Sequence, residues 1–231
     1  MKILIIAAPE ICADDFLGRI ERLCEAGADE ILLRAKELNE AEFYGLAVKV
    51  RDICSEFKRE FIVNHFFDAA AKLSASFWLT SAQLAGLAKE LGCGENLEYE
   101  QAKILSGAPR SRNFSLAELL NFKKLNPNAK IYAPAHDLAQ AEISSKIADI
   151  LVASHIFKTG CKAEEEPKGE RLISSLKCVN FNGKNPKIYA LGGINEQNFP
   201  LAVNAGADGI CLMSSAMRCE NERKFLANFI K

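Results

Sequence analysis

The strongest indication of the fold is the segment YALGGINEQNFPLAVNAGADGICLMSSAM, residues 189–217. Two short apolar runs, 187–191 and 209–213, flank a helical pattern at 196–205. Short apolar runs without polar alternation are typical of parallel strands buried on both faces. The stretch therefore predicts two parallel strands joined by a helix.

The same alternation of apolar runs and helical patterns continues along the whole chain. The expected strands are residues 2–8, 30–35, 61–64, 77–80, 130–133, 149–153, 187–191 and 209–213. Eight such units in 231 residues favour an α/β fold of the (β/α)8 TIM barrel type, with a doubly wound open sheet as the alternative. We expect a single barrel domain over residues 1–231, with an extended irregular segment around 85–130.

Composition argues against several classes of protein. Lys and Arg (29) nearly balance Asp and Glu (30), and no basic stripe is present, which argues against partners such as nucleic acid or a membrane surface. The eight cysteines form no C-x-x-C pair, which favours a reducing compartment over a disulfide framework or a zinc site. No apolar run has transmembrane length and the N-terminus does not read as a signal peptide, so the expected location is cytoplasmic.

The ends of the last two expected strands carry small residues. Gly192 and Gly193 end one strand, and Ser214 and Ser215 end the next. A phosphate group needs backbone N–H donors and little side-chain bulk, and barrels often build such a site from the loops after strands 7 and 8. We therefore expect these four residues to bind phosphate, although Gly-Gly alone would equally serve a tight turn. Asn195 is expected to cap the helix that follows.

These strand ends resemble the last two strands of the thiamine phosphate synthase and thiazole tautomerase (TenI-like) superfamily. Other segments resemble that family's motifs in the same order, namely LLRAK at 32–36, IVNHFFDAA at 62–70, AHDLAQA at 135–141 and ADILVASHIFKTGCK at 148–162. The resemblance implies a barrel and one of two reactions. The synthase joins a pyrimidine diphosphate to a thiazole phosphate and releases pyrophosphate with Mg²⁺. The tautomerase shifts a proton on a carboxythiazole phosphate without a metal. The segment 85–130 is longer than the resemblance explains.

The resemblance places substrate-binding residues on Arg34, Lys36, Asn64, Thr159 and Lys162. The three cations among them suit a phosphate or a carboxylate. Arg34 and Lys36 could instead form ordinary ion pairs at a strand end, but two cations at the end of one buried strand favour an anion site.

The positions that hold the family's acidic metal ligands are altered. They fall on His65 and, after the fourth strand, near Gln83, and neither side chain carries a carboxylate, the ligand type that Mg²⁺ usually takes. The family's substrate-contacting serine falls on Pro134, which has neither a hydroxyl nor an N–H. We expect no metal site and no cofactor, with Mg²⁺ required only if the chain is a synthase.

A proton-transfer reaction needs a group that titrates near neutral pH. The tautomerase branch places a histidine at the motif position of His136, which makes His136 the expected catalytic acid–base. His155 is a second candidate. Cys161 is expected to be an ordinary loop residue, because no base stands at a fixed spacing to activate it.

The main expectation is a thiazole tautomerase-like isomerase of thiamine biosynthesis, which aromatises a carboxythiazole phosphate. One alternative is a divergent thiamine phosphate synthase, a transferase. Another is a barrel that binds a phosphate ligand without chemistry. The expected partner is a thiazole phosphate-type small molecule, and because barrels of this size often pair, a homodimer is the oligomer to test.

Overall fold

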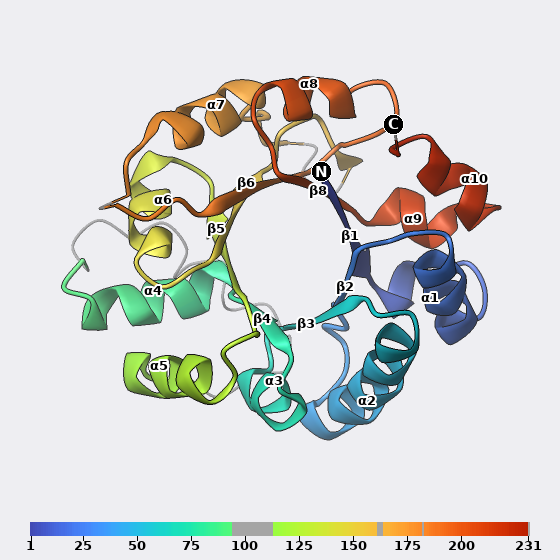
Figure 1. The fold of residues 1–231 in the computed structure, drawn as a ribbon, viewed down its shortest axis with the longest axis horizontal. Helices are drawn as coiled ribbons and strands as arrows, with labels where there is room; N and C mark the ends of the chain where they lie inside the picture. The colour runs from blue at the N-terminus through green and yellow to red at the C-terminus, as the bar shows by residue number, and fades with distance from the viewer. Residues whose placement is uncertain (94–112, 161–163, 182, 231) are drawn as a thin grey trace.

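The strands of this chain close into a barrel. The structure, a computed structural model, describes residues 1–93, 113–160, 164–181 and 183–230. Eight parallel strands pair in chain order, and β8 pairs with β1 to close the ring (Figure 1). They are β1 (Lys2–Ala7), β2 (Glu30–Leu33), β3 (Glu60–Asn64), β4 (Ser76–Trp78), β5 (Ile131–Ala135), β6 (Ile150–Ser154), β7 (Lys187–Leu191) and β8 (Gly209–Leu212). The predicted (β/α)8 barrel is confirmed, and the doubly wound alternative, which would leave two open sheet edges, is wrong.

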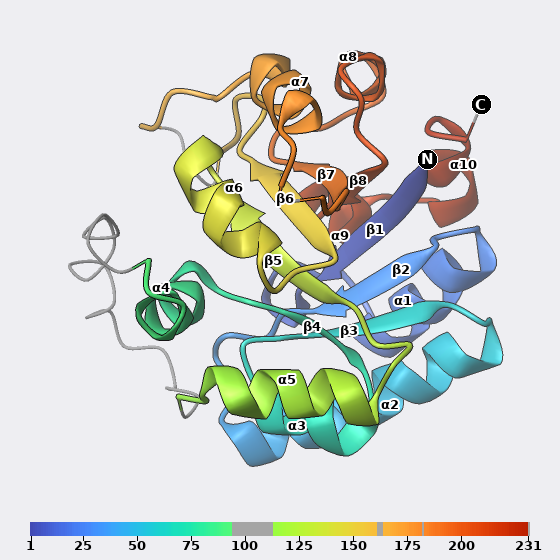
Figure 2. The same ribbon diagram turned by 60° about the vertical axis from the view of Figure 1, so that its left-hand side comes forward.

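Helices surround the barrel on its outside (Figures 1 and 2). They are α1 (Phe16–Glu25), α2 (Glu40–Glu56), α3 (Phe67–Leu73), α4 (Ser81–Glu90), α5 (Leu116–Leu125), α6 (Leu138–Ser145), α7 (Glu170–Cys178), α8 (Phe199–Asn204), α9 (Ser214–Arg218) and α10 (Glu222–Ala227), with a 3-10 turn at Pro9–Ile11. Within the expected irregular segment 85–130, residues 94–112 lie outside the described residues. None of the helices described has the length and apolar character needed to cross a membrane.

Two helices within residues 189–218 differ from the expectation. The helix expected at 196–205 begins only at Phe199, because the Asn195 side chain accepts the N–H groups of Gln197 (2.9 Å) and Asn198 (3.1 Å) and closes a turn instead. Asn195 therefore caps a turn and not the helix. In addition, α9 starts directly after β8, where no helix was expected, since five residues carry too little periodicity to reveal one.

Two hydrophobic clusters hold the barrel together. Alternate residues of a strand face opposite sides of the sheet, so Ile3 and Ile5 join an outer cluster with the helices, whereas Leu4 and Ile6 join an inner one. The inner cluster consists of strand residues, which are Leu4, Ile6, Leu32, Ile62, Trp78, Tyr132, Ile150, Val152, Tyr189 and Cys211. Side chains therefore fill the centre of the barrel, as is usual for this fold.

A buried carboxylate lies at the end of this inner cluster where the strands begin. Glu30, at the start of β2, is 2 % exposed and accepts hydrogen bonds from the hydroxyls of Tyr132 (3.0 Å) and Tyr189 (2.9 Å). Burial disfavours the charged carboxylate and raises the pKa of Glu30 despite these two donors. Burial, followed by the charge of Glu30, also raises the pKa of both tyrosines. These bonds connect β2, β5 and β7 across the barrel.

Three aspartates fasten neighbouring strands at their N-terminal ends. Asp29, Asp149 and Asp208 each stand immediately before a strand. The Asp29 carboxylate accepts the N–H of Ile3 (2.9 Å), while its own N–H donates to the carbonyl of the same residue (3.0 Å). Asp149 brackets Ile131 and Asp208 brackets Ile188 in the same way. We call these three residues the bracket aspartates.

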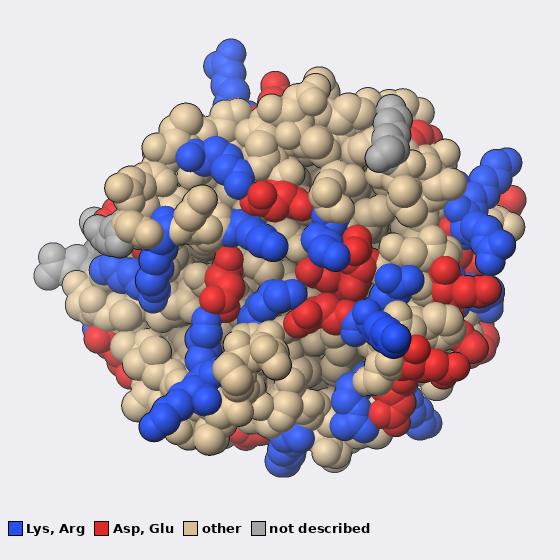
Figure 3. All heavy atoms as spheres, in the orientation of Figure 1, with Lys and Arg blue, Asp and Glu red and all other residues tan. Residues whose placement is uncertain are grey.

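Each bracket aspartate also binds a lysine. The N–O distances are 2.7 Å for Lys2 with Asp29, 2.6 Å for Lys123 with Asp149 and 2.6 Å for Lys177 with Asp208. Figure 3 shows basic and acidic side chains interleaved over one face of the molecule. Such pairing keeps the net field over that face small.

The bracket aspartates make a stability prediction. Asp29→Ala removes an acceptor for both a backbone N–H and Lys2, so the free energy of unfolding should fall by about 1–3 kcal/mol in urea titrations. Asp29→Asn keeps an acceptor and should lose less. The matched control is Asp52→Ala, whose side chain is 61 % exposed and pairs only with adjacent Arg51 among the described residues, so it should change stability by less than about 0.5 kcal/mol. Equal losses for Asp29→Ala and Asp52→Ala would contradict the bracket role.

The raised pKa of Glu30 makes a second prediction. The folded state keeps a proton on Glu30 at pH values where the unfolded chain, with the ordinary value of 4.5, releases it. The contribution of protonated Glu30 to the free energy of unfolding is therefore fully present below pH 4.5. This contribution is lost as the pH rises through the pKa of Glu30 in the folded state. Glu30→Gln cannot titrate, so its stability relative to the wild type should increase over that window and then level off. Urea titrations at several pH values measure this difference, and a difference independent of pH would refute the assignment.

Candidate functional site

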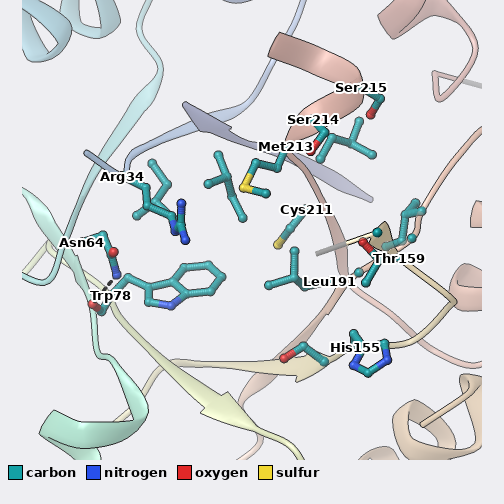
Figure 4. A pocket seen from close by; sticks show the side chains of 18 of the residues that line it. Arg34, Asn64, Trp78, His155, Thr159, Leu191, Cys211, Met213, Ser214 and Ser215 are labelled. Atoms are coloured by element: carbon teal, nitrogen blue, oxygen red, sulfur yellow. Dashed lines mark hydrogen bonds between the residues drawn. The ribbon is translucent and has the colours of Figure 1, made fainter. Parts of the chain in front are cut away.

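A cavity of about 510 Å³ opens at the C-terminal ends of the barrel strands (Figure 4). The predicted site residues that line it are Arg34, Asn64, Thr159, Gly192, Gly193, Ser214 and Ser215. Its volume lies within the range of small-molecule sites, roughly 300–1,000 Å³. The strand ends that the sequence analysis selected therefore meet around one space.

The two glycines pack directly against the segment that follows β6. Gly192 and Gly193 have φ angles of +103° and +66°, a region that favours glycine. A Cβ atom on Gly192 would lie 2.9 Å from the Cα of His155, and one on Gly193 would lie 2.7 Å from the carbonyl oxygen of Phe157. The N–H of Phe157 also donates to the carbonyl of Gly192 (2.9 Å). Gly-Gly therefore serves a close backbone contact and leaves bare backbone on the cavity wall.

Ser214 and Ser215 form the neighbouring wall. They occupy the first turn of α9, where backbone N–H groups have no acceptor within the helix. Both residues line the cavity, and Figure 4 shows them at the start of the helix beside Met213. The wall thus offers hydroxyl and N–H donors close to the bare backbone of Gly192 and Gly193, as phosphate binding requires.

The cation predicted after β2 reaches the cavity, but its neighbour does not. Arg34 lines the cavity and its guanidinium lies 3.2 Å from the carboxylate of Glu10. Lys36 is exposed on the following loop and is not part of the lining. Partial desolvation, followed by the charge of Arg34, lowers the pKa of Lys36. Arg34 therefore combines both predicted features: it forms an ion pair with Glu10, and it lines the cavity where an anion could bind.

The loop after β6 adds polar groups to the opposite wall. Thr159 lines the cavity together with Lys158, a cation that the sequence analysis did not select. Cys161 and Lys162 lie outside the described residues. Among the described residues of this loop, Lys158 is the cation that lines the cavity.

The two candidate histidines take different places. His136 is not among the residues that line the cavity, and its Nδ1 lies 2.8 Å from the carbonyl oxygen of Ser154 and 3.1 Å from the Ser154 hydroxyl. Ser154 does line the cavity, so His136 is connected to it through that residue. His155 is 3 % exposed, lies at the cavity edge and has Nε2 3.2 Å from the carbonyl oxygen of Glu165. The catalytic role of His136 stays a prediction.

The altered metal positions lie side by side. The amide nitrogen of Gln83 donates to the backbone carbonyl of His65 (2.7 Å), and its oxygen accepts the N–H of Thr80 (3.0 Å). Within the ranges described, no three His, Cys, Asp or Glu side chains gather as a metal site. Pro134, in β5, offers only its carbonyl, which accepts the Ser144 hydroxyl (2.7 Å). The residues at positions 65 and 83 therefore do not fit Mg²⁺, which is usually held by carboxylate oxygens.

The structure adds lining residues that the sequence analysis missed. Trp78, Ser154 and Cys211 lie near the C-terminal ends of β4, β6 and β8 with side chains toward the cavity. Once the strands are known, alternation along each one identifies the last inward position, and this signal could have found Trp78 and Cys211. Because these strands are buried on both faces, their sequences show no polar alternation that would mark the inward positions directly.

The fold and the cavity together define a (β/α)8 barrel. The C-terminal ends of its strands combine hydrogen-bond donors that suit an anion with an apolar cavity floor. Comparison with known proteins makes this more specific. The model of one family, thiamine monophosphate synthase, matches residues 3–79 and 118–216, and the chain belongs to this family. The resemblance to the superfamily is thereby confirmed, and the chain is assigned to thiamine biosynthesis.

Curated relatives and a solved structure agree with the family. The chain is 27 % identical over 233 residues to a thiamine-phosphate synthase of Fusobacterium nucleatum, covering 100 % of this chain and 96 % of that protein. It is 26 % identical over 208 residues to a thiamine-phosphate synthase of Desulfitobacterium hafniense, covering 90 % and 84 %. A thiamine phosphate pyrophosphorylase structure from Pyrococcus furiosus superposes with a TM-score of 0.71 at 21 % identity, covering 99 % and 93 %. That last likeness supports the fold.

The glycine contact predicts how the cavity responds to added bulk. Gly193→Ala places a methyl group against the backbone of the 155–158 segment at an unfavourable φ, so affinity for inorganic phosphate should fall about 10-fold or more, since a displaced N–H donor costs on the order of 1.4 kcal/mol. Gly45→Ala, in the outer helix α2, is the matched control, because the described residues place no atom within 4 Å of its added Cβ and it does not line the cavity. Calorimetric titration with phosphate measures both. Similar affinities for the two variants would show that the Gly193 wall does not bind the anion.

Proposed function

We propose that this protein is a thiamine-phosphate synthase that binds a thiazole phosphate in the rim cavity. In this reaction the thiazole nitrogen forms a bond to the methylene carbon of a pyrimidine diphosphate. The carbon–oxygen bond to the diphosphate breaks, and pyrophosphate leaves with that electron pair. The names of the curated relatives support this reaction over the tautomerase that the sequence analysis placed first. The observation that carries the proposal is the convergence of Gly193, Ser214 and Arg34 on one cavity.

The residues of the cavity suit the two ligands in different ways. Backbone and hydroxyl donors at the Gly192–Gly193 and Ser214–Ser215 ends would hold the phosphate of the thiazole. Arg34 and Lys158, on opposite walls, would balance the larger negative charge of a diphosphate. Binding of both ligands in the same apolar cavity would orient the thiazole nitrogen toward the methylene carbon.

The positions that the resemblance assigns to magnesium ligands lack acidic side chains. The side chains of His65 and Gln83 hold no carboxylate, and Gln83 is engaged with the backbone of His65. We therefore assign no step to a metal ion at these positions. Arg34 and Lys158 are the groups in the described rim that would stabilise the departing pyrophosphate.

The lack of carboxylates at positions 65 and 83 favours a second function, that of a thiazole tautomerase. This reaction needs one phosphate group and one proton-transfer group, and it needs no diphosphate site. His136 would exchange the proton with the ligand through the Ser154 hydroxyl, which lines the cavity and lies 3.1 Å from the His136 Nδ1. A barrel that binds the phosphate ligand without chemistry is the third outcome.

Product assays separate the three functions. With thiazole phosphate, pyrimidine diphosphate and Mg²⁺, the synthase should form thiamine phosphate, and Arg34→Gln should lower kcat/KM by about 10- to 100-fold, as expected when a charge-assisted contact in the transition state is lost. Arg51→Gln, on the outer helix α2, is the charge-matched control and should leave kcat/KM unchanged.

Other outcomes reassign the function. If no thiamine phosphate forms, but a carboxythiazole phosphate is aromatised by the wild type and not by His136→Ala, the tautomerase is correct. Equal turnover by wild type and His136→Ala would remove that assignment. Thermal stabilisation by the thiazole phosphate without any product would leave only binding.

A further inference from the structure

The indole of Trp78 forms part of the cavity wall. It is the last residue of β4, belongs to the inner cluster and is 9 % exposed. Figure 4 shows its ring reaching into the cavity opposite Thr159 and Ser214. The residue thus lies across the cavity from the wall that offers phosphate donors.

The Trp78 ring is fixed by its neighbours. Tyr132 stacks nearly parallel to it, with ring centroids 5.8 Å apart and an interplanar angle of 8°. The side chain of Asn64 donates to the backbone carbonyl of Trp78 (3.3 Å). Because Tyr132 supports the ring from within the barrel, its position is set before a ligand arrives, and little side-chain entropy is lost on binding.

The space beside Trp78 suits a flat, uncharged ring. Leu32, Leu191, Cys211 and Met213 line this part of the cavity. Burial raises the pKa of the Cys211 thiol, so the floor stays neutral. Thiol and thioether sulfurs make favourable contacts with aromatic rings.

We propose that Trp78 determines specificity for the ring of the ligand: a flat heteroaromatic ring stacks on the indole, while its phosphate is held at the Gly192–Gly193 and Ser214–Ser215 ends. This inference rests on the proposed function, since the thiazole phosphate is the ligand it describes. It assigns selection of the ring to β4 and selection of the phosphate to β7 and β8.

The chain supplies its own reporter for this contact, because Trp78 is its single tryptophan. Stacking of a heteroaromatic ring should quench the tryptophan emission in a saturable way. Inorganic phosphate, which has no ring, should bind without comparable quenching. Titration of the full-length wild type with the thiazole phosphate and with inorganic phosphate compares the two.

Two substitutions test the role of the ring in affinity. Trp78→Leu should weaken the thiazole phosphate about 5- to 100-fold, the range for loss of one stacked base, and leave inorganic phosphate within about 2-fold. Trp78→Phe keeps an aromatic platform and should lie between Trp78→Leu and the wild type. Calorimetry gives the affinities, and the thermal midpoint of Trp78→Phe shows whether the fold is kept. Gly193→Ala is the contrasting variant, since it should weaken both ligands.

Two results would overturn the proposal. One is equal quenching by both ligands, and the other is an equal loss of both affinities in Trp78→Phe and Trp78→Leu. Because binding is measured without turnover, a failure of the proposed function gives a different result, namely normal ring-dependent binding with no thiamine phosphate formed.

Discussion

The close contact between Gly192–Gly193 and the segment after β6 governs the shape of the functional end of this barrel. Neither position tolerates a Cβ atom, because backbone atoms of His155 and Phe157 occupy that space. The contact holds the loops after β6 and β7 together, and this brings Thr159 and Lys158 to the same cavity as Ser214. If the two loops separated, the cavity would lose one wall and the apolar floor would lie open to water.

Much of the fold followed from the sequence, because buried parallel strands leave a strong local pattern. Strand β7 was predicted to the residue, and the other strands within two residues at either end. Short elements were harder, since α9 has too few residues to show periodicity and Pro200 stands inside the expected start of α8. The bracket aspartates were also missed, because each one acts on a neighbouring strand through contacts that sequence spacing does not encode.

The candidate site was predicted in part for a similar reason. Gly193 and Ser214 lie at strand ends, and neighbouring strands of a closed barrel bring such ends together. The orientation of a loop side chain has no comparable rule, so Lys36 was expected in the cavity and lies outside it, whereas Lys158 lines it. His136 follows a strand as expected, yet its ring is turned toward Ser154.

The bracket aspartates have a consequence for how this barrel can change over evolution. They fasten β1, β5 and β7 at the end of the barrel opposite the cavity, and Glu30 joins three strands near that same end. Rigidity is thus anchored far from the rim where ligands are selected. Residues at the rim, such as His65 and Gln83, can be exchanged without loosening the anchor. Such a division between a fixed base and an adaptable rim allows one scaffold to drift from one phosphate chemistry to another while remaining folded.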